Sequence, residues 1–208
     1  MSLEERFPQL EPALLAEIKE KGTLKHVRAG DIIIKSGQYM PAAQLVLDGL
    51  LKVFREDDEG NEFFMYYIHS GQACALSINC AVRQIHSPVM ARAMQDTWLI
   101  SLPITDVDNW FRAYGTWDHF VLDAYRNRFD ELLLTLDQIA FRNMDERLLF
   151  YLKRYQHEMK TRDVKLTHQE IANELNSSRE VISRLLKKME ESGKIRLHRY
   201  HIEIVDLE

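Results

Sequence analysis

Apolar residues recur at helical spacing between residues 166 and 192, in two runs separated by a short polar stretch. The first run contains Leu166, Ile171 and Leu175, and the second contains Val181, Ile182, Leu185, Leu186 and Met189. This pattern predicts two short helices joined by a tight turn. Such a pair is typical of a helix-turn-helix motif, whose second helix enters the major groove of DNA.

Residues with strong backbone preferences mark the ends of both predicted helices. Thr167 and Glu170 have the spacing of a capping box, in which each side chain bonds the backbone amide of the other residue. Asn176 readily adopts the left-handed conformation and suits the turn. Ser178 can cap the second helix, and Gly193 is expected to end it.

The polar residues of the second predicted helix carry groups that can recognise bases. Glu180, Ser183 and Arg184 share one face, and Arg179 flanks it. Arg can pair with guanine O6 and N7, and Glu can accept from cytosine N4. We therefore expect these four residues to read base edges. The alternative is an ordinary helix with a solvated Glu180–Arg184 ion pair.

Residues 194–207 alternate apolar and polar positions, which predicts a two-stranded hairpin, the wing of a winged helix. Free amides at a helix start and nearby polar side chains can hold DNA phosphates. The residues expected to contact phosphate are His168, Gln169, Ser178, Lys187, Arg196 and Arg199. His198 and His201 supply too few ligands for a structural zinc ion, so no metal is expected.

Between residues 22 and 104, short apolar, β-branched or aromatic runs alternate with glycines. The runs cover residues 31–34, 44–47, 50–54, 63–68 and 98–102. Strands at this spacing predict a small antiparallel barrel or roll.

Residues 116–141 contain no Gly or Pro and carry a heptad pattern, which predicts a helix with a dimerisation seam. The seam residues are Leu122, Tyr125, Phe129, Leu132, Leu136 and Ile139. Leu133 and Ala140 lie beside the seam and predict a second face packed on the roll. A core helix of a monomer is the alternative. Asn143 and Glu146 then predict a fresh helix start.

The composition restricts the class of protein. A chain of 208 residues with 46% hydrophobic content allows one large or two modest folded domains. No run approaches the roughly 18 apolar residues of a membrane span, and the acidic N-terminus does not resemble a secretion signal. Cys74 and Cys80 are the only cysteines, which fits a reducing cytoplasm.

The net charge of −5 is unevenly distributed. From Asn143 onward there are 13 Lys and Arg against 12 Asp and Glu, a balance of +1, whereas the preceding part has 14 against 20. The acidity therefore lies outside the predicted DNA-binding part, and a dimer presenting two focused cationic patches is needed to explain affinity for phosphates.

Over nearly its full length the chain resembles the Crp/Fnr family of bacterial transcription factors. The resemblance rests on residues 29–37, Asp48-Gly49, the Gly60 turn, residues 70–72, the long helix and, most specifically, residues 166–189. It implies an α+β fold with a cyclic-nucleotide-binding-like β-roll (a double-stranded β-helix) at residues 1–115, a dimerisation helix at 116–142 and a winged helix-turn-helix at 143–208. Ser178-Arg179-Glu180 is similar to the cyclic-AMP receptor branch, in which the Arg and Glu read a G·C pair.

The sensory pocket departs from the pattern of the family. Cyclic-nucleotide binders carry a Gly-Glu that holds the ribose and an Arg-Ser that holds the phosphate. Here Gly71 is followed by Gln72, and Ser87-Pro88 stands where Arg-Ser is expected; Arg83 could substitute only if its loop shifts. A phosphate without a cation partner is poorly held, so tight binding of cyclic AMP is not expected.

Other sensors of this family hold an iron–sulfur cluster or haem. A cluster needs four thiolates and this chain has two cysteines, while Cys74, Cys80, His69 and His86 are better explained as ordinary structural residues. No cofactor is expected.

The resulting hypothesis is a cytoplasmic, homodimeric transcription regulator that binds a palindromic site in double-stranded DNA and contacts RNA polymerase, with an unknown effector. A ligand-sensing module that acts through protein contacts, with a vestigial winged helix, is the alternative. No P-loop, G-x-S-x-G or H-E-x-x-H motif indicates an enzyme.

Overall fold

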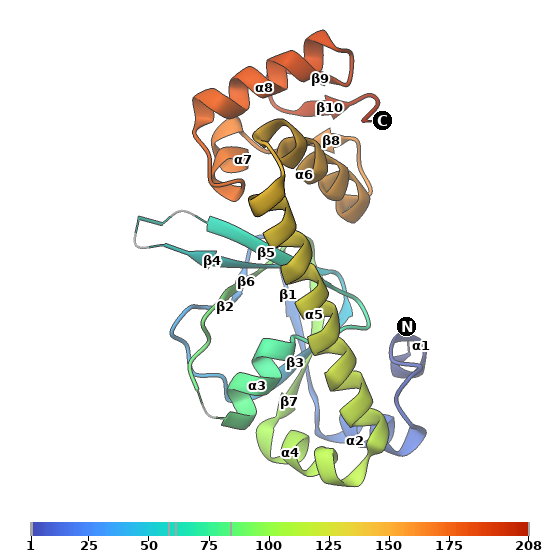
Figure 1. The fold of residues 1–208 in the computed structure, drawn as a ribbon. Helices are drawn as coiled ribbons and strands as arrows, with labels where there is room; N and C mark the ends of the chain where they lie inside the picture. The colour runs from blue at the N-terminus through green and yellow to red at the C-terminus, as the bar shows by residue number, and fades with distance from the viewer. Residues whose placement is uncertain (1, 58, 61, 84, 208) are drawn as a thin grey trace. The chain divides into compact units, whose positions relative to one another are not determined.

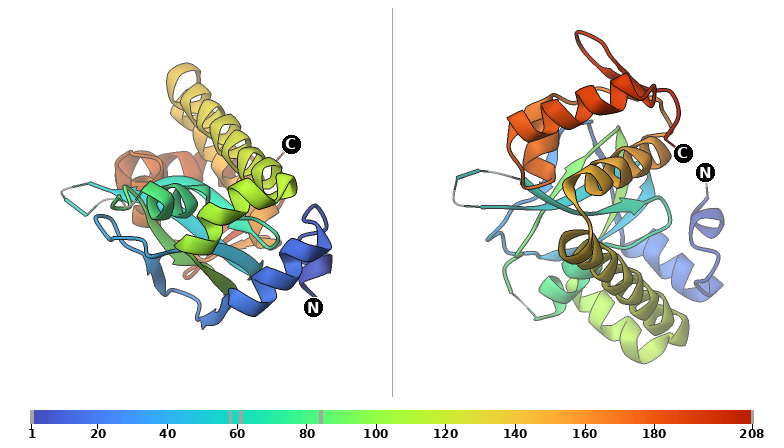
Figure 2. Two further views of the ribbon diagram at one scale, coloured as in Figure 1. Left: turned by 90° about the horizontal axis from the view of Figure 1, so that it is seen from below. Right: turned by 45° about the horizontal axis from the view of Figure 1, so that its top comes forward.

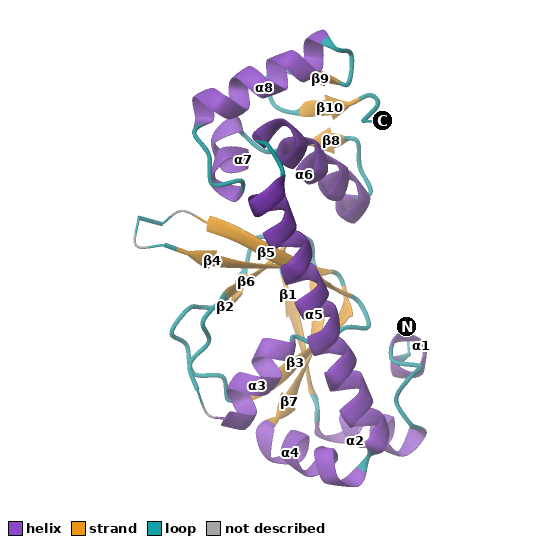
Figure 3. Ribbon diagram, viewed as in Figure 1, coloured by secondary structure: helices purple, strands orange, loops and turns teal. Residues whose placement is uncertain are grey.

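The computed structural model describes residues 2–57, 59–60, 62–83 and 85–207, and only the backbone of Ala81 and of residues 138–141. The fold is α+β, and the chain divides into two compact units. Residues 1–56 and 64–132 form the first unit, and residues 57–63 and 133–208 form the second. Figure 1 shows the order of the elements, and Figure 3 separates helices from strands.

The first unit contains a β-roll made of two antiparallel sheets. Its strands are β1 (Thr23–Val27), β2 (Ile32–Ile34), β3 (Ala42–Asp48), β4 (Leu50–Glu56), β5 (Glu62–His69), β6 (Met90–Ala93) and β7 (Thr97–Pro103). One sheet has the order β1-β7-β3, and the other has the order β2-β6-β4-β5. The roll predicted from the spacing of strands is confirmed. Asp58 and Asn61, beside the Gly60 turn, lie outside the described residues.

Strands β1 and β6 have no clear signal in the sequence. Four of the five residues of β1 are exposed, and β6 has the sequence Met-Ala-Arg-Ala, which carries no β-branched residue. Both segments are extended because they pair with stronger strands: Thr23 lies opposite Ser101 of β7, and Ala93 opposite Leu51 of β4.

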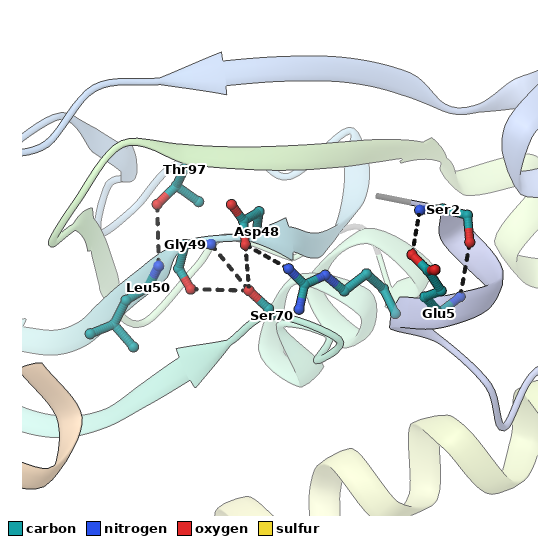
Figure 4. A network of polar contacts seen from close by, with 8 residues as sticks. Ser2, Glu5, Asp48, Gly49, Leu50, Ser70 and Thr97 are labelled. Carbon is teal, nitrogen blue, oxygen red and sulfur yellow. Dashed lines mark hydrogen bonds and ion pairs between the residues drawn. The ribbon is translucent and has the colours of Figure 1, made fainter. Parts of the chain in front are cut away.

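The turn between β3 and β4 requires a glycine. Gly49 has φ +108°, and a Cβ atom there would lie 2.3 Å from Thr97 Oγ1. Two hydroxyls hold this turn (Figure 4): Ser70 Oγ accepts from the Gly49 amide at 3.1 Å, and Thr97 Oγ1 accepts from the Leu50 amide at 3.3 Å. Gly49 therefore permits a close approach of β4 and β7.

Short helices that the sequence pattern did not predict surround the roll. They are α1 (Leu3–Arg6), α2 (Pro12–Lys21), α3 (Ala75–Arg83) and α4 (Ile104–Ala113). Glu17 joins α2 to α4, because its carboxylate accepts from Lys21 Nζ and Trp110 Nε1 at 2.8 Å and from Tyr114 Oη at 2.7 Å. Lys21 first, and then Tyr114 and Trp110, lower the pKa of Glu17 to about 2.

The long helix α5 (Gly115–Phe141) begins in the first unit and ends in the second, without interruption (Figure 2). Trp117, Phe120 and Val121 bury their side chains in the core of the first unit. The seam residues Leu122, Phe129 and Leu136 are 68%, 61% and 58% exposed, and Leu132 is also exposed. The predicted side chain of Ile139 lies outside the described residues.

Two residues of α5 differ from the prediction. Leu133, which was predicted to pack on the roll, is exposed, and the side chain of Ala140 lies outside the described residues. Arg128, five residues before Leu133, is buried. The seam residue Tyr125 is half-buried, and its hydroxyl donates to the Ala75 carbonyl at 2.9 Å. This turn of α5 thus packs on the roll through Tyr125, which was predicted to lie in the seam, and through Arg128, which a count of apolar positions does not include.

The second unit contains a separate hydrophobic core between three helices and a small sheet. Its elements are α6 (Met144–Met159), β8 (Asp163–Val164), α7 (His168–Glu174), α8 (Arg179–Glu191), β9 (Ile195–Leu197) and β10 (Ile202–Ile204). The sheet has the order β8-β10-β9, so the predicted hairpin gains a third strand. Asn143 caps α6 through the predicted capping box with Glu146.

Candidate nucleic-acid interface

The predicted boundaries of the helix-turn-helix are confirmed in detail. Thr167 Oγ1 accepts from the Glu170 amide at 3.2 Å, and the Thr167 amide donates to the Glu170 carboxylate at 2.6 Å. Asn176 has φ +49°, as the tight turn requires. Ser178 Oγ accepts from the Val181 amide at 3.3 Å and starts α8. The local sequence therefore fixes the direction in which α8 leaves the turn.

Helix α8 has one buried face and one charged face. Ile182, Leu185 and Leu186 are buried in the core of the second unit. The side chains of Arg179, Glu180, Arg184 and Lys187 are exposed, and within the described part of the chain none of them forms a hydrogen bond or an ion pair. The alternative of a Glu180–Arg184 ion pair is therefore not what the structure shows.

Ser183, the fourth expected base reader, differs from the other three. It is half-buried, and its hydroxyl lies 2.9 Å from His168 Nδ1 on α7. Burial, and then the nearby Arg179, lower the pKa of His168, which favours the neutral imidazole over the protonated one. The structure thus places His168, a predicted phosphate contact, next to Ser183, a predicted base reader.

A groove of about 630 Å³ lies between the start of α7, the start of α8 and the wing. Its lining includes the cationic residues Lys165, Arg179 and Arg199 and the imidazoles of His168, His198 and His201. No Asp or Glu is among the residues that line it. A cationic groove beside an exposed recognition helix suits a phosphate backbone.

The wing hairpin is braced by its own side chains. The rings of His198 and His201 stack with centroids 4.4 Å apart, and His198 Nε2 lies 3.0 Å from Glu203. Arg196 also pairs with Glu203, at 3.5 Å, so part of its charge is neutralised. Arg199 instead lies over the ring of Tyr200, which is 77% exposed at the tip.

Lys165 and Tyr200 also line the groove, although the sequence did not lead us to expect either of them to contact DNA. The signals that could have identified them are their places in the sequence. Lys165 lies just before the capping box, and Tyr200 is an aromatic residue within the predicted hairpin. Of the predicted phosphate contacts, His168, Gln169 and Arg199 line the groove. Ser178, Lys187 and Arg196 lie outside its lining.

Helix α6 is bonded to both ends of the recognition segment. Arg147 Nη2 donates to the Leu175 carbonyl at 2.6 Å, immediately before the turn that leads into α8. Asp145 forms an ion pair with Lys188, in the last turns of α8. Together these contacts hold α6, α7 and α8 in one arrangement.

The residues expected to form an effector pocket are engaged by the protein or exposed. Gln72 Oε1 accepts from the His69 amide at 3.0 Å and from Arg128 Nη2 at 3.3 Å. The buried Ser87 hydroxyl bonds the carbonyl and amide of Val89. Arg83 is exposed at the end of α3, and Gly71 has φ +80°.

The two cysteine thiols are buried, and burial raises the pKa of both Cys74 and Cys80. Among the described residues, no group of three or more His, Cys, Asp or Glu side chains is placed to hold a metal ion. None of the helices in the described ranges has both the length and the apolar character that crossing a bilayer requires.

Residues 146–208 match the Crp-like helix-turn-helix domain. The fold matches a protein assigned to the Crp/Fnr transcriptional regulators, from Eubacterium rectale, with a TM-score of 0.86, 29% identity and coverage of 99% of this chain and 96% of that one. The chain is therefore similar to Crp/Fnr-family regulators over nearly its whole length, and residues 146–208 carry a Crp-like helix-turn-helix domain. No match to a curated protein sequence was found.

Other solved structures share the fold. The c-di-GMP responsive global regulator CLP of Xanthomonas campestris has a TM-score of 0.78 at 14% identity, covering 93% of this chain and 99% of that one. A Crp/Fnr-family regulator from Thermus thermophilus has a TM-score of 0.71 at 20% identity, covering 89% and 94%. The Crp-like domain match begins within α6 and includes α7, α8 and the wing, so the charged face of α8 lies in the matched part.

Proposed function

We propose that this chain is a Crp/Fnr-type transcription regulator that works as a homodimer, reads a palindromic DNA site with two copies of α8 and does not depend on cyclic AMP. The observation that carries the proposal is the exposed face of α8. Its Arg179, Glu180 and Arg184 side chains have no partner within the described residues and lie beside a cationic groove. Such side chains are available for base edges, and the groove is available for the phosphates that flank them.

The individual contacts follow from chemistry and position. Arg179 and Arg184 suit guanine, and Glu180 suits the amino group of cytosine. Lys165, Gln169 and Arg199 in the groove suit phosphate, and Lys187 extends this set along α8. His168 holds Ser183, so we assign it a positioning role in addition to a phosphate contact.

Dimerisation through α5 is supported by the exposure of its seam. Leu122, Phe129, Leu132 and Leu136 recur at heptad spacing on one helix and are exposed in the single chain. Covering them with a second copy would present two recognition helices to half-sites about one helical turn apart. RNA polymerase is the further partner that we propose for a regulator of this kind.

Independence from cyclic AMP is supported by the state of the predicted pocket. No Arg takes the place of the expected phosphate ligand, Ser87 is bonded to Val89, and Gln72 is bonded to Arg128. A cyclic phosphate would need a cationic partner that this segment does not provide.

Selection of binding sites from random duplex DNA, followed by fluorescence anisotropy, tests the proposal. Arg179→Ala should weaken binding by about 1–3 kcal/mol and relax preference at one base position per half-site. Arg162→Ala is the matched control, because Arg162 is an exposed arginine of the same unit outside the groove. Unchanged preference in Arg179→Ala would show that the assigned register is wrong. Binding that does not depend on salt would favour a module that acts through protein contacts.

A further inference from the structure

A single arginine of α5 is buried in the β-roll. Arg128 is 8% exposed and lies on the helix that carries the proposed dimer seam. Arginine is rarely buried unless its charge and its donors are paired. Its position therefore reflects a specific set of contacts with the roll, which the heptad pattern of α5 did not reveal.

The contacts of Arg128 connect three parts of the first unit. Nη1 donates to the Tyr67 carbonyl of β5 at 2.6 Å and to the Glu131 carboxylate of α5 at 2.8 Å. Nη2 donates to Gln72 Oε1 at 3.3 Å. The guanidinium also lies 4.6 Å from the ring centre of Tyr66. We call this set of contacts the Arg128 clamp.

The clamp occupies the side chain of Gln72, which stands at a position where the resemblance places a contact with a ligand. Gln72 directly follows Gly71, where the resemblance to cyclic-nucleotide binders places a ligand-holding Glu. In this chain the Gln72 amide oxygen already accepts from Arg128 and from the His69 amide. The cation in this region is thus supplied by the chain itself, from the helix that leads toward the DNA-binding part.

We propose that Arg128 replaces a small-molecule effector: by binding α5 to β5 and Gln72, it keeps the protein in its DNA-binding conformation without an added ligand. This inference rests on the proposed function and deepens it, because it specifies how DNA binding is regulated. Without the clamp, α5 can leave the roll, and the population of the binding-competent conformation falls. A lysine cannot replace the clamp fully, because it lacks the planar fork of donors.

The test compares four proteins without added ligand: the wild type, Arg128→Gln, Arg128→Lys and Arg112→Gln. Arg112 is an exposed arginine of α4, so Arg112→Gln makes the same change of charge outside α5 and outside the DNA-binding part. The wild type should bind its selected site without a cyclic nucleotide. Arg128→Gln should lose about tenfold or more in affinity, Arg128→Lys should lose less, and Arg112→Gln should bind like the wild type.

Hydrogen exchange gives a second measurement that does not involve DNA. Backbone amides of β5 and of the segment of α5 around Arg128 should exchange faster in Arg128→Gln than in the wild type, with no change in Arg112→Gln. If Arg128→Gln does not fold, exchange rates and DNA affinity are compared between Arg128→Lys and the wild type instead, and a loss in Arg128→Lys supports the clamp.

Three results would overturn the clamp. A folded Arg128→Gln that binds DNA as the wild type does, with unchanged exchange, is the first. A stoichiometric small molecule retained by the wild type in a native mass measurement is the second, and a gain of about tenfold or more in wild-type affinity on adding cyclic AMP is the third. If the wild type itself shows no salt-dependent DNA binding, the proposed function fails, and the exchange experiment alone then decides whether the clamp exists.

Discussion

Helices α5 and α8 each leave one face exposed, and the chemistry of these two faces is opposite. Leu122, Phe129 and Leu136 are exposed on α5, whereas Arg179 and Arg184 are exposed on α8. Apolar side chains in water gain free energy when another apolar surface covers them. Charged side chains are well solvated alone and gain from a partner of complementary charge or hydrogen-bonding pattern. The two faces therefore suit different partners, which we propose are a second copy of the chain for α5 and a nucleic acid for α8.

The largest expected effect comes from placing a charged residue on the exposed apolar face of α5. Leu136→Glu should prevent dimerisation, because two carboxylates would be buried in the seam, and DNA affinity should fall by about 100-fold or more because the second half-site is no longer engaged. Sedimentation equilibrium and anisotropy measure the two effects.

Leu134→Glu is the matched control for this substitution. Leu134 is 51% exposed on the same helix but lies on the opposite side from the seam. We expect it to leave both dimerisation and DNA affinity unchanged. Equal losses in the two variants would show that the heptad assignment of the seam is wrong.

A smaller effect is expected from removing one charge of α8 that does not read bases. Lys187→Ala should weaken binding to specific and random duplexes alike, and it should lower the slope of log affinity against log salt by about 1. Titrations at several salt concentrations measure this slope. A change of base preference in this variant, with an unchanged slope, would move Lys187 from the phosphates to the bases.

The smallest expected effect concerns His168 on α7, which contacts Ser183 on α8. The pKa of His168 is lowered from its usual value of 6.5, so the unfolded chain binds a proton there more readily than the folded chain. The stability that His168 contributes is therefore present above about pH 6.5 and is lost as the pH falls through that value and below it.

Melting temperatures of the wild type and of His168→Gln, measured between about pH 7.5 and pH 5.5, test this sign. The wild type should lose stability relative to the variant as the pH falls, and the difference between the two proteins isolates His168 from the other histidines. A relative gain in wild-type stability at low pH would mean that the proton stabilises the His168–Ser183 contact.

Local sequence was enough to predict both helices of the motif and most strands of the roll. Caps such as Thr167 and turns such as Asn176 act within a few residues, and so do the periodicities of buried positions. The Arg128 contacts with Gln72 and Tyr67 span 56 and 61 residues, and the His168–Ser183 contact spans 15. Such pairs depend on which segments the fold brings together, so a pattern of apolar positions cannot reveal them.

Bonds from the first two turns of α6 to Leu175 and to Lys188 also limit what regulation can change. Because these contacts join α6, α7 and α8 within the second unit, we expect the three helices to move together in any rearrangement of that unit. In the proposed dimer, a signal would then change the separation and tilt of the two DNA-binding parts, while the bases that each part recognises would stay the same. DNA sites with a changed spacing between the half-sites are therefore expected to distinguish the regulated from the unregulated state of the protein. Sites with changed half-site sequences are not expected to do so.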